Sequence, residues 1–263
     1  MGIVNVTPDS FSDGGRHNDV SAAVQHAYQL MAEGAGIVDV GGESTRPGAR
    51  QISEQEELDR VIPVIESLRQ ESSMPISIDS SKPIVMREAV KAGANLINDV
   101  RALTVEGALA TAVELDVPVC LMHMQGQPDS MQDSPHYLHV VYEVRNWLQT
   151  RAEECVRAGL SAGKICIDPG FGFGKTLDHN LLLLEYLDVL VASDFPVLVG
   201  LSRKSMFGQL LNQPDTDKRL MPSVMAAGIA VLKGAAIVRV HDVAETRQAI
   251  SLCQALIEKR GNS

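Results

Sequence analysis

The sequence has few cysteines and no paired cysteine motif. The four cysteines among 263 residues are Cys120, Cys155, Cys166 and Cys253, and none belongs to a C-x-x-C pair. Cys120 and Cys166 fall inside apolar, strand-like runs. Such spacing is typical of reduced, buried thiols and not of a disulfide framework or a zinc site. The chain also opens on an apolar run without a signal-peptide pattern, so we expect a cytoplasmic protein.

An unbroken apolar segment and an excess of positive charge are also missing. The apolar stretch over residues 181–199 is interrupted by Glu185, Asp188, Asp194 and Pro196, which excludes a membrane span there. Lys and Arg number 23 against 33 Asp and Glu, which gives a formal net charge of -10. A chain this acidic is not expected to bind nucleic acid or an anionic membrane, although a local anion site remains compatible with it.

No G-x-G-x-x-G follows a strand-like run, so the dinucleotide-binding fingerprint is absent too. Eight short runs rich in Val and Ile instead alternate with helical patterns, as strands buried on both faces of a parallel sheet do. The runs are residues 3–6, 37–40, 75–79, 96–100, 118–122, 165–168, 196–200 and 236–241. This rhythm predicts an α/β fold, a single (β/α)8 TIM barrel over residues 1–263 with its active site at the C-terminal ends of the strands. A doubly wound open sheet is the alternative, but it more often has fewer strands.

Helix signals lie between these runs. Ser53 and Glu56 are spaced as a capping box at the start of a helix, and Pro63 should kink that helix. Gly34 is expected to cap the C-terminus of the preceding helix. Further helices are expected after the fifth strand and near residues 180–192, 222–232 and 244–259.

Polar side chains follow almost every strand. They are Asn5, Asp39, Asp79, Asn98 with Asp99, His123, Asp168, Lys204, and Arg239 with His241. The ends of barrel strands share one rim, so Asp79, Asn98 and Asp168 should converge there. Two carboxylates and an amide suit an aminopyrimidine-like heterocycle, because a carboxylate accepts two parallel N–H bonds and Asn pairs with a donor and an acceptor together. Buried carboxylates also need a ligand or a cation such as Lys204; a self-satisfied Asp–Lys pair is the alternative.

Positive charge gathers at the last two strands of this acidic chain. Arg239 and His241 stand two apart on a strand and therefore point the same way, and Lys204 follows the neighbouring strand. Together they predict an anion clamp at strands seven and eight, a frequent phosphate site in this fold. Arg203 has the opposite parity to Lys204, so it either joins the clamp or forms a structural salt bridge.

Three loops after strands are rich in glycine and polar residues. They cover residues 7–15, 41–48 and 168–175, and all should overhang the active end. Loops that carry Phe11, Arg46 and flanking glycines suit a lid over a charged substrate, with a connector of no function as the alternative. The third loop could present Phe173 as an apolar wall.

Five segments together closely resemble the dihydropteroate synthase family of bacterial folate biosynthesis. They are residues 2–15, 41–48, 168–175, 200–205 and 239–243, and the similarity runs from Met1 to the last helix. Members of that family usually have an additional N-terminal stretch before the strand on which this chain opens. The resemblance implies a transferase that joins 6-hydroxymethyl-7,8-dihydropterin diphosphate to p-aminobenzoate, releasing pyrophosphate and 7,8-dihydropteroate, and it implies a homodimer.

The resemblance also implies residue roles. Asp79, Asn98, Asp168 and Lys204 would hold the pterin. The diphosphate would be bound by Asn5, Thr45, Arg239 and His241, with Asn5 also a ligand to Mg²⁺. The residues around p-aminobenzoate would be Phe11, Arg46, Pro47, Phe173, Lys204 and Ser205. Lys204, Asp168, Arg239 and His241 would then be the catalytic residues, and either Asp9 or Asp13 would approach the metal.

Three other functions compete with this interpretation. A methyltetrahydrofolate:corrinoid methyltransferase would share the pterin pocket but has no use for a diphosphate clamp. A noncatalytic pterin-binding or dimerisation paralogue could lose Asn5, Asp9, Phe11 or Arg46, all of which are present. A sugar-phosphate barrel would be poorly served by the Asp79, Asn98 and Asp168 set.

Overall fold

The structure is a computed structural model that describes residues 1–7, 15–44, 49–127 and 130–261. The strands are β1 (Gly2–Asn5), β2 (Val38–Gly41), β3 (Ile76–Asp79), β4 (Leu96–Asp99), β5 (Val119–Met122), β6 (Ile165–Asp168), β7 (Leu198–Val199) and β8 (Ile237–Val238). The α-helices are α1 (Gly15–Ala32), α2 (Glu54–Glu71), α3 (Pro83–Ala92), α4 (Ala108–Leu115), α5 (Val140–Arg157), α6 (Leu177–Glu185), α7 (Leu187–Val191), α8 (Ser205–Leu210), α9 (Leu220–Leu232) and α10 (Val243–Gly261), with the short 3-10 helices η2 (Ala162–Lys164) and η3 (Asp217–Arg219).

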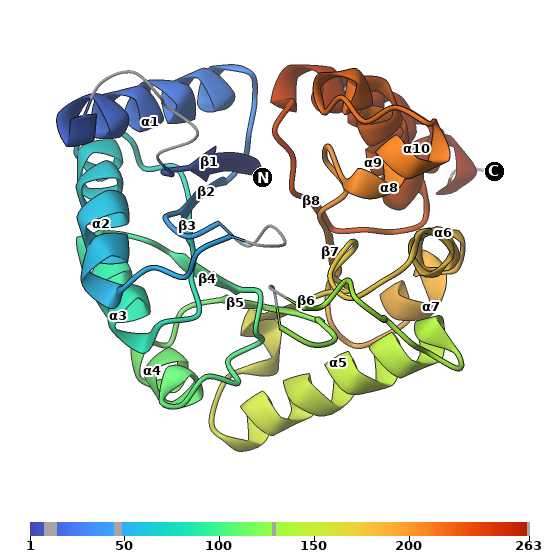
Figure 1. The fold of residues 1–263 in the computed structure, drawn as a ribbon, viewed down its shortest axis with the longest axis horizontal. Helices are drawn as coiled ribbons and strands as arrows, with labels where there is room; N and C mark the ends of the chain where they lie inside the picture. Colours follow the sequence, from blue (N-terminus) through green and yellow to red (C-terminus); the bar gives the residue numbers. More distant parts are fainter. Residues whose placement is uncertain (8–14, 45–48, 128–129, 262–263) are drawn as a thin grey trace.

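The eight strands form a parallel ring. β1 to β6 pair in chain order, and β7 pairs with β8. Single parallel bridges join Ile167 to Val197 and Gly2 to Val240, which connects the two sheets on both sides. Figure 1 shows the strands around a common centre with the helices outside them. The predicted (β/α)8 barrel is therefore confirmed.

All eight predicted strands are present, but the last two are shorter than expected. Residues 196–200 and 236–241 were expected to be extended, whereas only Leu198–Val199 and Ile237–Val238 form a continuous ladder. The flanking residues Val197 and Val240 instead make the single bridges that close the ring. These strands therefore pair with two neighbours over only a few residues each.

The apolar residues form two separate cores. The larger core packs the outer face of the strands against the helices. The smaller one, formed by Cys120, Cys166 and Leu198 with Met1 and Ile237 against it, fills the barrel below the strand ends. Cys120 and Cys166 are direct partners in the β5–β6 register. All four cysteines are buried and free, as predicted.

The helix signals are largely confirmed. The Ser53 hydroxyl accepts a hydrogen bond from the Glu56 amide at 3.1 Å, but the Glu56 carboxylate pairs with Arg60 and does not complete the predicted box. Gly34 has a φ of 100°, in the left-handed region of a C-terminal cap. Pro63 lies within α2. None of the helices in the described part of the chain is long and apolar enough to cross a membrane.

Two glycines allow the loops after β5 and β6 to pack backbone against backbone. Gly170 has a φ of 66°, and a Cβ on it would lie 1.9 Å from the His123 carbonyl oxygen. Gly174 has a φ of 62°, and its Cβ would lie 2.3 Å from the Gln125 carbonyl oxygen. Neither contact can be relieved by a side-chain rotation, so both positions require glycine.

We expect Gly170→Ala to lower the free energy of unfolding by about 1–3 kcal/mol or more, because a strained φ and a backbone clash act together. The measurement is the urea midpoint of unfolding. Gly36→Ala is the matched control, since a Cβ at Gly36 would meet nothing within 4 Å. Equal midpoints for the two variants would contradict the proposed packing of the loops.

Candidate active site

Arg239 joins two acidic strands at the mouth of the barrel. Its Nε lies 2.5 Å from Asp39 Oδ2, and its Nη2 lies 2.7 Å from Asp79 Oδ2. Asn98 Nδ2 donates to the same Asp39 oxygen at 3.1 Å. Asp39, Asp79 and Asn98 belong to β2, β3 and β4, and Asp79 is the direct register partner of Asn98. Side chains alternate between the two faces of a strand, so these residues converge inside the ring.

Burial dominates the electrostatics of this cluster. It raises the pKa of Asp79 to about 7, against the opposing charge of Arg239, and the nearby Asp39 adds to the rise. Burial alone would lower the pKa of Arg239, but Asp39 and Asp79 together raise it. Arg239 therefore stays charged, while Asp79 can exchange a proton near neutral pH.

The raised pKa of Asp79 predicts a pH-dependent stability. Its value of about 7 in the folded protein exceeds the ordinary 3.8, so the folded state binds this proton more tightly. The contribution of Asp79 to the free energy of unfolding should therefore fall as pH rises from about 4 to about 7, and stay constant above that. Thermal unfolding of the wild type and of Asp79→Asn measures it: the stability difference should shift in favour of the variant across this window. A difference that does not change with pH would contradict the account.

Asp168 and Lys204 lie on the opposite side of the mouth. Asp168 ends β6 and is 5% exposed, and its Oδ1 accepts a hydrogen bond from the Gly170 amide at 2.7 Å. Burial raises its pKa, which Gly170 and Lys204 oppose. Lys204 Nζ lies 4.3 Å from the centre of the Phe173 ring. Burial lowers the pKa of Lys204 to about 8, although the charge of Asp168 acts in the other direction.

Two cations face the strand-end carboxylates. Lys204, the cation expected from the sequence, opposes the rise in the pKa of Asp168, and Arg239 forms the ion pairs to Asp39 and Asp79. A guanidinium presents several donors in one plane, so it can bind two carboxylates from different strands at once. Lys204 is left beside Asp168 and Phe173.

Arg239 and His241 have different partners despite their spacing. His241 Nδ1 lies 2.9 Å from Ser202 Oγ, and the His241 amide donates to the same oxygen at 3.1 Å. Arg203 forms the structural salt bridge that was one of its two alternatives. Its Nε and Nη2 lie 3.0 and 2.6 Å from the two oxygens of Asp242. The loops after β7 and β8 are thus linked by two side-chain contacts.

The remaining predicted residues divide into two groups. Asn5 ends β1, is half-buried and pairs in register with Gly41, while Ser205 is the exposed first residue of α8. The others lie outside the described residues: Asp9, Phe11, Asp13, Thr45, Arg46 and Pro47.

Sequence reasoning did not assign two buried acidic residues that the structure brings to this end. Asp39 is fully buried within β2, and Glu57 is fully buried on the core face of α2. Lys82 Nζ contacts Glu57 at 2.6 Å and Glu43 at 2.9 Å, which neutralises the second carboxylate. The sequence contains a sign that each is buried. Asp39 lies within an apolar run, and Glu57 precedes Val61 by four residues, which places both on the same face of a helix.

Asn5 at the end of β1 is the described residue that the family resemblance names as a Mg²⁺ ligand. Among the described residues, no group of three or more His, Cys, Asp or Glu could hold a metal. Mg²⁺ takes oxygen ligands and is commonly bound by one or two protein oxygens together with substrate phosphates and water. The amide oxygen of Asn5 is of this type.

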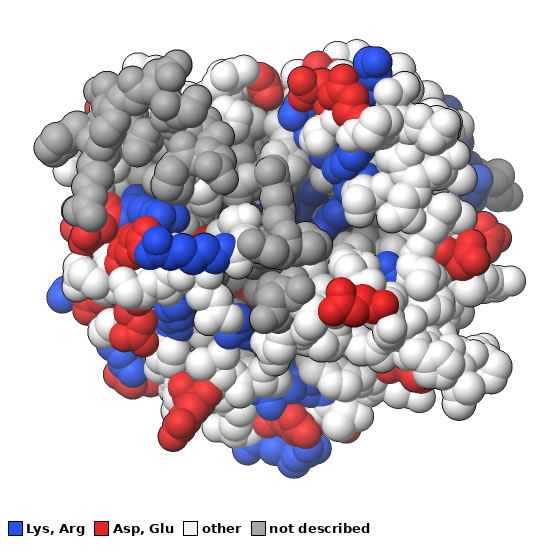
Figure 2. All heavy atoms as spheres, in the orientation of Figure 1, with Lys and Arg blue, Asp and Glu red and all other residues white. Residues whose placement is uncertain are grey.

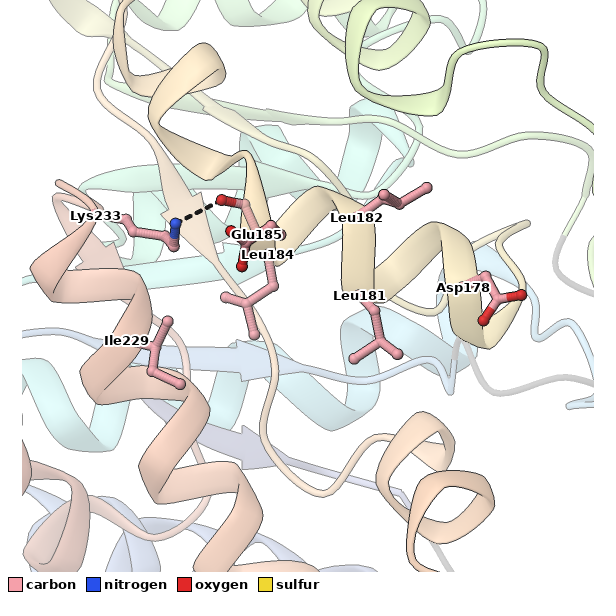
Figure 3. Close-up of a pocket in the computed structure, with 7 residues that line it drawn as sticks. All are labelled: Asp178, Leu181, Leu182, Leu184, Glu185, Ile229 and Lys233. Carbon is pink, nitrogen blue, oxygen red and sulfur yellow. Dashed lines mark hydrogen bonds between the residues drawn. The ribbon is translucent and has the colours of Figure 1, made fainter.

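A separate groove lies on the outside of the barrel, between α6 and α9. Figure 3 shows the side chains that line it, with Lys233 donating a hydrogen bond to the Glu185 carbonyl. They are Asp178, Leu181, Leu182, Leu184, Glu185, Ile229 and Lys233. None of these residues is at a strand end, so the groove is not part of the candidate active site.

The face seen in Figure 2 mixes acidic and basic side chains. It is unlike the clustered basic surface that typifies nucleic-acid binding.

Comparisons with known proteins support the barrel fold and place the chain in a family. The family model described as "Pterin binding enzyme" matches residues 1–241. The chain is 52% identical over 262 residues to dihydropteroate synthase of Escherichia coli K12, covering 100% of this chain and 93% of that protein. A Yersinia pestis dihydropteroate synthase solved with a sulfonamide drug superposes with a TM-score of 0.93 at 53% identity, covering 98% of this chain and 94% of that one. A Xanthomonas albilineans dihydropteroate synthase in complex with 7,8-dihydropteroate gives a TM-score of 0.89 at 48% identity, covering 97% and 92%.

Proposed function

The chain belongs to the pterin binding enzyme family, and from this premise we propose that it is a dihydropteroate synthase. It condenses 6-hydroxymethyl-7,8-dihydropterin diphosphate with p-aminobenzoate and releases pyrophosphate. The observation that carries the proposal is the set of acceptors at or next to three strand ends, buried Asn98 and Asp168 with the partly buried Asp79, in a chain 52% identical to such an enzyme over its full length.

We assign the pterin to this polar set. Asp79 and Asp168 would accept N–H bonds from the amino-pyrimidinone edge, and Asn98 would pair with a donor and an acceptor of the ring. Burial raises the pKa values of both carboxyl groups because it removes the water that would solvate their charges. The N–H groups of a bound neutral ring would supply hydrogen bonds in place of that water. Lys204 lies beside the same pocket and would bind a ring acceptor.

The leaving group is assigned to the basic side of the mouth. His241 and the charged Arg239 would bind the diphosphate, with Asn5 as the protein ligand to Mg²⁺ and Thr45 as a further contact. When bound, Mg²⁺ would supply positive charge against the departing pyrophosphate. Arg239 would serve both sides, since its guanidinium touches Asp39 and Asp79 and has further N–H donors.

The p-aminobenzoate site is assigned to the space beside Phe173 and Lys204. The Phe173 ring offers an apolar wall, and Ser205 lies next to Lys204 at the start of α8. Phe11, Arg46 and Pro47 complete this assignment on the basis of the family resemblance alone.

The proposed reaction requires stabilisation of the negative charge on the departing pyrophosphate, and it does not require a strong base. Departure of pyrophosphate from the pterin methylene can proceed through a resonance-stabilised cation, which the arylamine nitrogen then attacks. The buried carboxylates hold the electron-rich pterin in place, while Arg239 and His241 stabilise the charge that develops on the leaving oxygen. The amine is nucleophilic as the free base, and it loses its proton after the bond has formed.

We further propose that the protein forms a homodimer through α9 and α10, which pack side by side (Figure 1). Met221, Met225 and Ile229 recur every fourth residue on α9 and are 67%, 60% and 40% exposed. Leu252 and Leu256 on α10 are 64% and 46% exposed. Apolar stripes on adjacent helices are typical of subunit interfaces.

Met225→Glu should therefore convert the dimer to a monomer, because a carboxylate in the centre of a small apolar interface loses its hydration without gaining a partner. The measurement is the molar mass by light scattering. Glu245→Gln, in the first turn of α10, is the control and is expected to leave the molar mass unchanged. A wild-type protein that is monomeric at micromolar concentration would contradict the dimer.

The cellular location is proposed to be the cytoplasm. Four buried, free cysteines support it, because thiols of this kind are typical of a reducing compartment.

Formation of 7,8-dihydropteroate tests the proposed function. The purified protein should convert p-aminobenzoate to this product, measured by mass spectrometry, only when the pterin diphosphate is present. Sulfonamides should compete with p-aminobenzoate, as mimics of it. Methyl transfer from methyltetrahydrofolate, or pterin binding without product, would support one of the competing functions instead.

A further inference from the structure

Lys175 is a buried cation to which the assignments above give no role. It is 3% exposed and follows β6 by seven residues. Its Nζ lies 3.0 Å from His123 Nδ1 and donates to the Phe173 carbonyl oxygen at 2.9 Å. A buried ammonium is costly unless its hydrogen bonds are satisfied, so these contacts must offset the loss of hydration.

The two partners of Lys175 come from different loops of the active end. His123 directly follows β5, and Phe173 lies in the loop after β6. The same loops meet where Gly170 and Gly174 approach the backbone of His123 and Gln125. The hydroxyl of Tyr137 also donates to the Gly174 carbonyl oxygen at 2.9 Å. Among the described residues of this contact, Lys175 is the one whose side chain hydrogen-bonds to Phe173, at its carbonyl oxygen.

The electrostatics agree with this arrangement. Burial lowers the pKa of His123 to about 3, and the charge of Lys175 adds to the effect, so the imidazole is neutral and its Nδ1 can accept a hydrogen bond. Burial lowers the pKa of Lys175 to about 7, which the charge of Asp168 opposes. Lys175 can donate to both partners in either protonation state.

We propose that Lys175 is a positioning residue that ties the loop after β5 to the loop after β6 and thereby fixes the Phe173 wall of the p-aminobenzoate site. The proposal rests on the proposed function. It assigns Lys175 no contact with either substrate. Its effect reaches the reaction through Phe173, whose ring lies against Lys204.

Lys175→Met keeps the length of the side chain and removes all three donors. We expect the KM for p-aminobenzoate to rise about tenfold, with a much smaller change in the KM for the pterin diphosphate, because misplacing one wall weakens one substrate. Lys164→Met is the matched control. It removes a lysine that bonds the Asp116 carbonyl at the opposite end of β6, and both KM values should stay unchanged.

A double-mutant cycle separates positioning from general damage. In a Phe173→Ala background, Lys175→Met should have little further effect on the KM for p-aminobenzoate, because the wall is already gone. His123→Leu provides a second variant if Lys175→Met fails to fold; it should raise the same KM less, and His123→Asn, which keeps an acceptor, should restore it.

Equal changes in the two KM values, or additive effects in the cycle, would overturn the proposal while leaving the proposed function intact. A folded wild-type protein that forms no dihydropteroate would instead contradict the function itself. The two failures are therefore distinguishable in one set of rate measurements.

Discussion

Asp168→Asn is expected to lower kcat/KM for the pterin diphosphate at least about a hundredfold. Asp168 is 5% exposed and ends β6, and the asparagine keeps the oxygen that accepts the Gly170 amide. The substitution removes the negative charge, and it replaces the second carboxylate oxygen, which would accept an N–H bond from the pterin, with an NH₂ group that can only donate. A hydrogen bond to a charged group contributes about 1.5–3 kcal/mol, so loss of a charge-assisted pair corresponds to a factor of this size.

Initial rates with both substrates varied measure this effect, and circular dichroism checks that the barrel is intact. Asp188→Asn is the control, since Asp188 is an exposed aspartate in α7, and its rates should match the wild type. Lys204→Ala should lower turnover by a similar factor, because Lys204 lies against the Phe173 ring and interacts with the charge of Asp168. Near-normal rates in both Asp168→Asn and Lys204→Ala would contradict the assignment of the pterin site.

Arg239→Met is expected to have the largest effect on stability, a loss of about 3–5 kcal/mol in the free energy of unfolding. The variant leaves Asp39 and Asp79 without their cation in a buried site, and removal of one member of a buried ion pair costs about this much. Denaturant unfolding measures it, preferably near pH 8, where the carboxyl groups are most ionised.

Two further variants decide whether the unpaired charge is the cause. Arg239→Met combined with Asp39→Asn should be more stable than Arg239→Met alone, because one of the two stranded carboxylates is removed. Arg203→Met breaks a comparable bidentate pair, but the Arg203 side chain is 34% exposed, so its loss should be smaller. An Arg239→Met protein as stable as Arg203→Met would contradict the central position given to Arg239.

The barrel could be predicted from the sequence because its strands are buried on both faces. Such strands need largely apolar runs, and in this chain a polar residue lies at or near the C-terminal end of most runs. That pattern located the ends of β1 to β6 within one residue. The extents of β7 and β8 could not be predicted, because the residues that flank them pair with β6 and β1 through single bridges.

Strand ends predicted that Asp79, Asn98, Asp168 and Arg239 lie on one rim of the barrel, but not which of these side chains pair. Sequence parity placed Arg239 and His241 on one face, yet one binds Asp39 and Asp79 and the other binds Ser202. Which cation pairs with which carboxylate depends on how far each side chain extends across the ring. The spacing of residues along one strand does not give that information. The contact of Lys175 could not be predicted for a similar reason, since its partner His123 lies 52 residues away in the sequence.

Pyrophosphate release tests the central claim most directly. We assign the pterin to the polar strand ends, its diphosphate to Arg239 and His241, and p-aminobenzoate to the space beside Phe173. Sustained release of pyrophosphate should therefore require the pterin diphosphate, p-aminobenzoate and Mg²⁺ together, and omission of any one should reduce it to background. A purified, folded protein that releases no pyrophosphate with all three present would contradict the account, as would release at the full rate without p-aminobenzoate.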